Sequence, residues 1–330
     1  MRHLFLIEDP MLARISTLLA AATLALAATT PARAADTLRI GFMTFVPYSA
    51  SLLARQNGWV EEELKKAGHG DVKVTWTQFA GGPPVNEAFA SGNLDVAALG
   101  DTPALVGHAS GIPTRLVGLA YQGGQAQALL VRKDAPYKHV AELKGKKVAT
   151  LRGGNVHELL VLILQEAGLK LSDVAFINLS LQDMGTALLK GDIEAALAWD
   201  PVFTRLESEG QARILRDGKG LKNNLNPIVA SQTLVEKHPA YLQAYLRAIA
   251  RGAQALKDDP NGSAKALAPT FGLTPEQTLI AFSRSQWLPP VNDDVRAELK
   301  RSVGFLLENR LVRNTFDVDA FIDLSAAPKQ

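Results

Sequence analysis

Cysteine is absent from this chain of 330 residues. Its absence excludes disulfides, thiolate metal sites, a cysteine nucleophile and the modified cysteine of a lipoprotein signal. Lysine- or arginine-rich runs are absent too, and the formal net charge is only +2. A charge this small gives no reason to expect nucleic acid or an anionic membrane as a partner. The 47% of hydrophobic and 21% of charged residues are typical of a soluble globular protein.

Familiar catalytic and cofactor motifs are also missing. The sequence contains no phosphate loop of the form G-x-x-x-x-G-K-[ST], no G-x-G-x-x-G fingerprint, no G-x-S-x-G elbow and no H-E-x-x-H pair. Its carboxylates show no spacing that singles out an acid–base pair. We therefore expect a protein that is not an enzyme, with neither catalytic residues nor a resident metal or other cofactor.

The N-terminal segment has the order of a secretory signal. A basic residue precedes an apolar run over 18–28, and an A-x-A motif ends at Ala34. The apolar run is too short to span a bilayer. We expect residues 1–34 to be a signal peptide, cleaved before Ala35, and the mature protein to be periplasmic. Whether translation starts at Met1 or Met11 stays open.

Beyond the signal, strand-like and helix-like segments alternate in two runs, which is typical of open α/β sheets. The predicted strands are 37–43, 71–79, 94–100, 115–121, 128–134, 147–151, 174–179, 193–199 and 228–234. The predicted helices are 49–68, 84–91, 102–110, 155–167, 183–189, 239–258, 275–282 and 293–309.

The two runs predict two α/β lobes, each a mostly parallel sheet flanked by helices. We expect one lobe to be formed by 35–124 and 228–330 and the other by 125–227. The chain would cross between them near 123–127 and again near 226–229. A ligand would lie between the lobes, at the carboxyl ends of the strands, where open α/β sheets bind ligands.

Three strand-to-helix turns carry glycine. They are Gly81–Gly82, Gly100–Thr102 and the turn at Gly154–Asn155. Free N–H groups and the helix dipole make a helix start a ready anion site, and glycine lets the anion approach the backbone. The alternative is ordinary turn chemistry, with Asp101 and Asn155 as N-caps. The residues alone indicate an anion-friendly cleft and leave both interpretations open.

Two further candidates follow strands or begin helices. Trp199 and Asp200 end a predicted strand, so the indole could cover an organic group, or it could be a core tryptophan beside an N-cap. His157 lies in the first turn of its helix and could donate to an anion, although a lone histidine is more often structural.

Taken together, these segments resemble the aliphatic sulfonate-, nitrate- and taurine-type periplasmic binding proteins of ABC importers, and the aliphatic sulfonate-binding group most closely. The matching stretches are TLRIGF at 37–42, AGGPPVNEAFASGNLDVAALGDTPALVGHASG at 80–111, AELKGKKVATLRGGNVHELLVLILQEAGLKLSDV at 141–174, ALLKGDIEAALAWDPVFTRLE at 187–207 and ENRLV at 308–312. The resemblance covers nearly all of 37–325.

The resemblance implies the type II periplasmic-binding-protein fold, with two hinge crossings. It implies a monomer that captures an alkane- or arylsulfonate and delivers this small anionic solute to an ABC permease. The ligand-contacting residues carried over by position are Met43, Thr44, Gly81, Gly82, Gly100, Asp101, Thr102, Gln122, Gly154, Asn155, Val156, His157, Trp199, Asp200 and Asn226.

Two departures leave the ligand headgroup open. Asn155 and Val156 stand where the sulfonate group has serines, so hydroxyl donors are lost. The turn FMTFVPYSA at 42–50 is apolar and aromatic, which favours an organic ligand over a bare inorganic anion. Taurine, a sulfate ester, nitrate and a thiamine-pyrimidine precursor remain alternatives. Pyrimidine synthases resemble this fold but carry a cysteine-rich motif, and regulators of the LysR type need a helix-turn-helix where this chain has a signal peptide.

Overall fold

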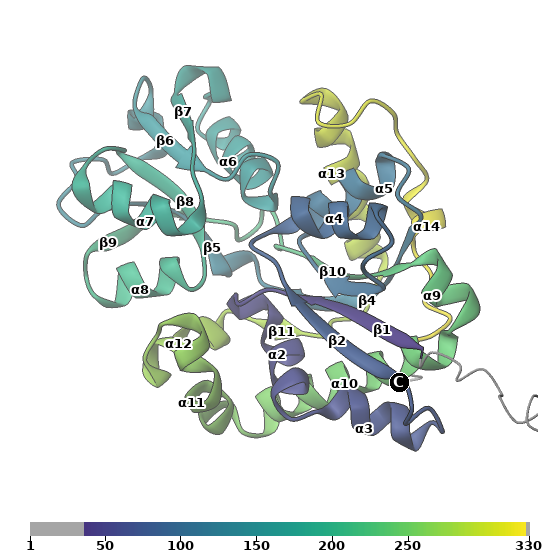
Figure 1. Cartoon of the computed structure of the whole chain (residues 1–330). Helices are drawn as coiled ribbons and strands as arrows, with labels where there is room; N and C mark the ends of the chain where they lie inside the picture. The colour runs from purple at the N-terminus through teal and green to yellow at the C-terminus, as the bar shows by residue number, and fades with distance from the viewer. Residues whose placement is uncertain (1–35, 328–330) are drawn as a thin grey trace, which may run out of the picture. The chain divides into compact units, whose positions relative to one another are not determined.

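Two β-sheets, each flanked by helices, make up residues 36–327, the part of the chain that the computed structural model describes (Figure 1). The predicted signal peptide 1–34 and its cleavage site lie outside the described residues. Between them the two sheets account for every predicted strand segment.

The first sheet has six strands in the order β11-β4-β10-β3-β1-β2. Their bounds are β1 (Thr37–Phe42), β2 (Lys73–Gln78), β3 (Val96–Ala98), β4 (Thr114–Gln122), β10 (Asn226–Ser231) and β11 (Gln286–Trp287). Strand β1 is parallel to β2 and β3, whereas β10 is antiparallel to both of its neighbours, β3 and β4. At the edge, β11 is antiparallel to β4.

The second sheet has five strands in the order β7-β6-β8-β5-β9. Their bounds are β5 (Gln127–Arg132), β6 (Lys147–Thr150), β7 (Ala175–Asn178), β8 (Ala195–Trp199) and β9 (Ala212–Asp217). Strand β6 is parallel to β7 and β8, and β5 is antiparallel to β8 and β9.

The prediction of mostly parallel sheets is confirmed, although both sheets are mixed: β10 and β11 in the first sheet and β5 in the second run against the other strands. The chain passes from β4 to β5 and returns from β9 to β10. At both crossings the chain leaves one sheet at the carboxyl ends of its parallel strands and enters the other sheet at the carboxyl ends of that sheet's parallel strands. The entering strands, β5 and β10, therefore run antiparallel to their neighbours. The return falls within 218–225, earlier than the predicted 226–229, which belongs to β10.

Thirteen α-helices and four short 3₁₀ helices connect the strands of the described residues. The α-helices are α2 (Ser49–Gln56), α3 (Trp59–Lys66), α4 (Gly82–Ala90), α5 (Asp101–Ala109), α6 (Asn155–Glu166), α7 (Leu181–Lys190), α8 (Val202–Ser208), α9 (Gln232–Lys237), α10 (Pro239–Asp258), α11 (Pro260–Phe271), α12 (Pro275–Ser283), α13 (Asp293–Glu308) and α14 (Val318–Phe321). The 3₁₀ helices are η1 (Val46–Tyr48), η2 (Gly124–Ala126), η3 (Val140–Leu143) and η4 (Leu171–Asp173). None of the helices within 36–327 has the length and apolar character needed to cross a membrane.

Two predicted segments differ in the structure. The helix predicted over 49–68 is two helices, because Gly58 has φ +64° and breaks the pattern between α2 and α3. The strand predicted over 228–234 ends at Ser231, whose hydroxyl accepts from the Leu234 N–H and caps α9. Strands β9 and β11 and helices α9, α11 and α14 were not predicted.

Candidate ligand-binding site

A cavity lies where the carboxyl ends of parallel strands from both sheets converge, at the turns that follow β1, β2, β3, β6 and β8. This is the edge at which open α/β sheets bind ligands. Its volume is about 610 Å³ with the open space at its mouth included. It is lined by Met43, Phe45, Pro47, Tyr48, Ala80, Gly81, Gly82, Pro83, Gly100, Pro103, Leu151, Arg152, Gly153, Gly154, Asn155, Val156, Trp199, Asn224 and Asn226.

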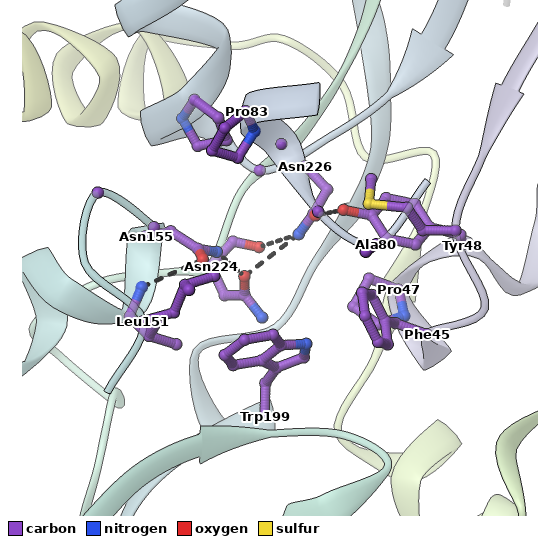
Figure 2. A pocket seen from close by; sticks show the side chains of 18 of the residues that line it. Phe45, Pro47, Tyr48, Ala80, Pro83, Leu151, Asn155, Trp199, Asn224 and Asn226 are labelled. Atoms are coloured by element: carbon purple, nitrogen blue, oxygen red, sulfur yellow. Dashed lines mark hydrogen bonds between the residues drawn. The ribbon is translucent and has the colours of Figure 1, made fainter. Parts of the chain in front are cut away.

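One side of the cavity is aromatic. Trp199, at the end of β8, faces the turn after β1, where Phe45 and Tyr48 lie (Figure 2). The rings of Phe45 and Trp199 meet edge to face, with centroids 5.9 Å apart and an interplanar angle of 85°. Such a wall offers apolar surface to the organic part of a ligand.

Carboxylates are missing from the lining within the described residues, and Arg152 is its one charged residue. The Arg152 side chain is exposed, and its guanidinium lies 4.6 Å from the centre of the Phe176 ring. A ligand in the cavity would therefore meet neutral groups and no fixed negative charge, which suits an anion.

Two helices begin at the cavity without a side-chain cap. Gly81 and Gly154 are the N-caps of α4 and α6, and neither start is capped by a side-chain hydrogen bond. No hydrogen bond within 36–327 uses the backbone N–H of Gly82 or of Asn155. These two helix starts thus keep backbone donors for a ligand.

The third turn, at the start of α5, is different from what we expected. The Asp101 N–H donates to the Leu225 carbonyl at 3.0 Å, and the Thr102 N–H donates to Asp101 Oδ1 at 2.8 Å. Pro103 has no N–H. Each backbone N–H in the first turn of α5 is therefore either hydrogen-bonded within the protein or absent. Helix α5 lines the cavity but offers no free backbone donor to a ligand.

A chain of side-chain amides crosses the cavity (Figure 2). Asn155 Nδ2 donates to Asn224 Oδ1 at 2.5 Å. Asn226 Nδ2 donates to the Asn224 backbone carbonyl at 3.1 Å and lies 3.2 Å from Asn224 Oδ1. The Tyr48 hydroxyl donates to Asn226 Oδ1 at 3.0 Å. These hydrogen bonds link α6, the segment 218–225 that returns the chain to the first sheet (the return segment), β10 and η1.

Nine of the fifteen predicted ligand residues line this one cavity. They are Met43, Gly81, Gly82, Gly100, Gly154, Asn155, Val156, Trp199 and Asn226. The other six do not line it, and they are Thr44, Asp101, Thr102, Gln122, His157 and Asp200.

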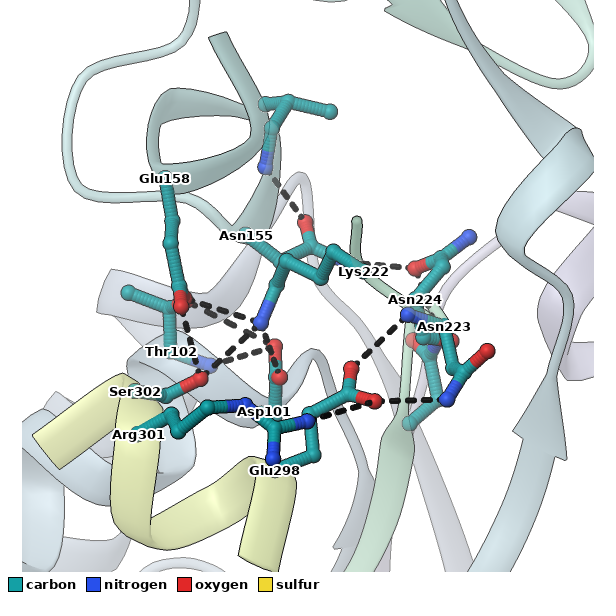
Figure 3. Close-up of polar contacts among 12 residues, drawn as sticks. Asp101, Thr102, Asn155, Glu158, Lys222, Asn223, Asn224, Glu298, Arg301 and Ser302 are labelled. Atoms are coloured by element: carbon teal, nitrogen blue, oxygen red, sulfur yellow. Dashed lines mark hydrogen bonds and ion pairs between the residues drawn. The ribbon is translucent and has the colours of Figure 1, made fainter. Parts of the chain in front are cut away.

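Asp101 and Thr102 face a buried ion cluster instead (Figure 3). Lys222 Nζ lies 2.6 Å from Asp101 Oδ2, 2.8 Å from Glu158 Oε2 and 3.0 Å from Ser302 Oγ. The side chains of Lys222, Asp101 and Glu158 are 1%, 0% and 5% exposed. Thr102 Oγ1 joins the cluster with Glu158 Oε2 at 3.4 Å. The start of α5 therefore holds the cluster rather than a ligand.

The cluster shifts the pKa values of Lys222 and Glu298. Burial acts to lower the pKa of Lys222, but the charges of Asp101, Glu158 and Glu298 outweigh it and raise that pKa, so the ammonium stays charged. Burial raises the pKa of Glu298 despite the opposing charge of Lys222. Glu298 also accepts hydrogen bonds from the backbone N–H and the Nδ2 of Asn223, at 2.8 and 2.6 Å.

Two more of the six are buried away from the cavity. His157 lies against the rings of Phe176 and Phe305, and its pKa is lowered by burial first and by Arg152 second, so the imidazole is neutral. Asp200 is 1% exposed, and its Oδ1 accepts from the Thr204 N–H at 2.9 Å, inside the first turn of α8.

The remaining two lie in neighbouring segments. Gln122 Nε2 donates to Gln286 Oε1 at 2.6 Å, where β4 pairs with β11. Thr44 lies between β1 and η1 and is partly exposed. Across residues 36–327, no group of three or more histidine, cysteine or acidic side chains gathers as metal ligands would.

Sequence reasoning missed three polar members of the lining, namely Tyr48, Arg152 and Asn224. Tyr48 was treated only as part of an apolar turn, and Asn224 lies in the return segment, for which the sequence offers no motif. The positive φ of Asn224, +51°, suits asparagine better than most residues, but it is visible only once the chain has been traced.

Comparison with known proteins identifies the family of this chain. The family model described as NMT1/THI5 like matches residues 49–263. A relative from Escherichia coli (strain K12), whose name assigns it to the aliphatic sulfonates-binding proteins, is 30% identical over 91% of this chain and 92% of its own length. The chain belongs to the NMT1/THI5-like family. The resemblance that the sequence motifs suggested is thereby confirmed.

Solved structures share the fold of this NMT1/THI5-like chain. The alkanesulfonate-binding protein SsuA from Xanthomonas axonopodis pv. citri, solved bound to MOPS, is 28% identical with a TM-score of 0.79, over 88% of this chain and 99% of that one. The desulfurization enzyme DSZB is 19% identical with a TM-score of 0.63, over 88% of this chain and 97% of its own, and shows the fold alone. The predicted α/β binding-protein fold is confirmed.

Proposed function

We propose that this protein is an extracytoplasmic solute-binding protein, which captures an alkane- or arylsulfonate and delivers it to an ABC permease. The observation that carries the proposal is the cavity lining. Its described residues include no carboxylate, two helix starts leave backbone N–H groups without partners, and an aromatic wall faces them.

The headgroup chemistry fits this lining. A sulfonate has three acceptor oxygens and no donor, so it needs N–H groups around it and is repelled by carboxylates. Gly82 and Asn155 supply backbone N–H groups at the starts of α4 and α6, while Trp199 and Phe45 supply a surface for the organic tail. The relatives described as sulfonate-binding proteins support the same ligand class.

We further propose that the two sheets belong to two lobes, 35–124 with 228–330 and 125–227, which close on the ligand about the two crossings. The cavity takes residues from both sheets, and the return segment carries Asn224 into it. Residues 1–34 would direct export to the periplasm, where relatives of this family operate.

A transport role is better supported than catalysis. The relatives at 28–30% identity cited above are described as binding proteins, whereas the desulfurization enzyme is only 19% identical. The chain shares only its fold with the desulfurization enzyme, and it contains no cysteine that could serve as a nucleophile.

Calorimetric titration of the mature protein tests the ligand assignment. The titrants are methanesulfonate, longer alkanesulfonates, an arylsulfonate, taurine, nitrate, sulfate and an uncharged pyrimidine. We expect alkane- and arylsulfonates with tails long enough to reach Trp199 to bind most tightly. Binding of nitrate or an uncharged pyrimidine, with no sulfonate bound, would overturn the ligand assignment. Small-angle scattering that shows one unchanged shape at saturating ligand would contradict lobe closure.

A further inference from the structure

One buried amide in the cavity has donors and no acceptor. Asn224 lines the cavity and is 2% exposed, yet its Nδ2 has no hydrogen-bond partner among the described residues. Figure 2 shows this nitrogen directed into the space above Trp199. Buried polar groups are normally paired, so a donor left open at the wall of a cavity points to a ligand.

The neighbours fix which end of the Asn224 amide faces the cavity. The backbone carbonyl of Asn224 only accepts, so the group of Asn226 that lies 3.1 Å from it must be the NH₂. The same NH₂ lies 3.2 Å from the Asn224 side chain, so the Asn224 atom that faces it must be the oxygen.

A second neighbour gives the same answer independently. Asn155 Oδ1 accepts from the backbone N–H of Val156 at 3.1 Å, which directs its NH₂ toward Asn224. Rotating the Asn224 amide by half a turn would set its NH₂ against two other NH₂ groups. The oxygen of Asn224 is therefore used inside the amide chain, and both N–H bonds of its Nδ2 remain for the cavity.

The return segment holds this donor in place. On one side of Asn224, Asn223 is bound twice by Glu298, and Lys222 is held by Asp101 and Glu158. On the other side, Asn226 is already part of β10. Since these contacts fix the backbone around Asn224, the donor is preorganised and a ligand has little ordering to do.

We propose that Asn224 is the residue that selects the headgroup of the ligand, by donating from Nδ2 to one of its oxygens. A headgroup made only of acceptor oxygens satisfies the open donor, whereas a headgroup that presents N–H toward Asn224 leaves two donors facing each other. Together with the backbone N–H groups of Gly82 and Asn155, Asn224 Nδ2 gives the cavity wall a third unpaired donor. This inference rests on the proposed function, because it concerns the same cavity.

The test exchanges the donor for an acceptor at constant shape. Asn224→Asp keeps an oxygen for Asn155 and Asn226 and suits the same φ, but it turns a carboxylate oxygen toward the cavity. The measurement is the affinity for two ligands with one tail, an alkanesulfonate and the matching primary alkanesulfonamide, whose NH₂ replaces one oxygen. We expect wild type to prefer the sulfonate, and this preference to fall by at least about tenfold in the variant.

Two further variants keep the result interpretable. Asn93→Asp adds the same charge at an exposed position outside the cavity lining, and should leave both affinities within about threefold of wild type. Asn224→Gly tolerates the positive φ and removes the donor without adding charge, so sulfonate binding should weaken by at least about tenfold. Thermal melting of each variant establishes whether it is folded. If Asn224→Asp does not fold, the sulfonate affinity of Asn224→Gly tests whether the Asn224 donor binds the headgroup.

The outcomes separate this inference from the proposed function. If wild type binds no sulfonate, the proposed function fails. If wild type binds sulfonate while Asn224→Asp keeps the wild-type preference within about threefold, Asn224 does not select the headgroup, and the proposed function stands. If Asn224→Asp lowers the affinities for sulfonate and sulfonamide equally, the inference is likewise overturned, because such a result would reflect disturbed packing rather than a lost donor.

Discussion

The cavity and the ion cluster behind it share one segment of chain but use polar groups in opposite ways. Asn224 opens an uncharged amide to the cavity, while Lys222, two residues earlier, is enclosed by acidic and hydroxyl groups (Figure 3). Every charge in the cluster has a partner within the protein. Asn224 in the amide chain, by contrast, keeps a donor that has no partner among the described residues.

The difference separates two tasks. Buried charges are costly to leave unpaired, so a cluster of this kind mainly affects the stability of the fold. Uncharged donors cost less to bury and can exchange water for ligand, so they suit reversible capture. We therefore expect changes in the cluster to alter unfolding, and changes in the amide chain to alter affinity.

Lys222→Met is expected to have the largest effect. It removes the cation between Asp101 and Glu158 and leaves their carboxylates buried with neutral hydrogen-bond donors but no compensating charge. The free energy of unfolding should fall by about 3–5 kcal/mol, measured by urea titration. Lys219→Met, at an exposed lysine of the same segment, should change it by less than about 0.5 kcal/mol. A loss below about 1 kcal/mol in Lys222→Met would show that the cluster contributes little to stability.

Asp200 extends the comparison to a buried carboxyl that has no cation in contact. Burial raises its pKa from 3.8 to about 6, so the stability it contributes is full below pH 4 and is lost as the pH rises through 6. Asp200→Asn keeps the oxygen that accepts from the Thr204 N–H and is always neutral. Relative to wild type it should gain on the order of 2–3 kcal/mol at pH 8 and almost nothing at pH 4. Urea titrations at both pH values check this, and a difference independent of pH would contradict it.

Asn155→Asp brings a charge into the amide chain itself. The new carboxylate lies at the start of α6, and it also opposes Asn224 Oδ1, which favours a turned amide with its oxygen toward the cavity. Sulfonate affinity should fall by tenfold or more, about 1.4 kcal/mol, in calorimetric titration. If this variant binds as tightly as wild type, the anion does not lie at that helix start.

Trp199→Ala should have the smallest and most selective effect. The indole faces Phe45 across the cavity and contacts no part of the amide chain by hydrogen bonding, so only ligands with a tail should lose contacts. We expect long or aromatic sulfonates to weaken by about tenfold and methanesulfonate by less than about threefold. Titration of the whole series distinguishes this result from equal weakening, which would place the headgroup, not the tail, against Trp199.

Local signals in the sequence predicted much of the fold and part of the site. The alternation of strands and helices holds, and the glycine turns at 81–82 and 154–155 lie at helix starts that face the cavity. Turn chemistry is local, because glycine and proline restrict or free the backbone at their own positions. The turn at 100–102 looked the same in sequence, but its donors are used by Leu225 and by Asp101 itself. Whether the Asp101 N–H is free for a ligand therefore depends on Leu225, which lies 124 residues further along the chain.

By itself the sequence determined most of the elements, the converging glycine turns and the absence of thiol chemistry, since each follows from residue types and their spacing over a few positions. Only the tertiary structure decided which way the polar groups point. Lys222 meets Asp101 and Glu158 from distant parts of the chain, and Asn224 acquires its open NH₂ only because Asn155 and Asn226 occupy its oxygen. The direction of an amide or a carboxylate is set by its partners in space, and the spacing of residues along the chain does not encode them.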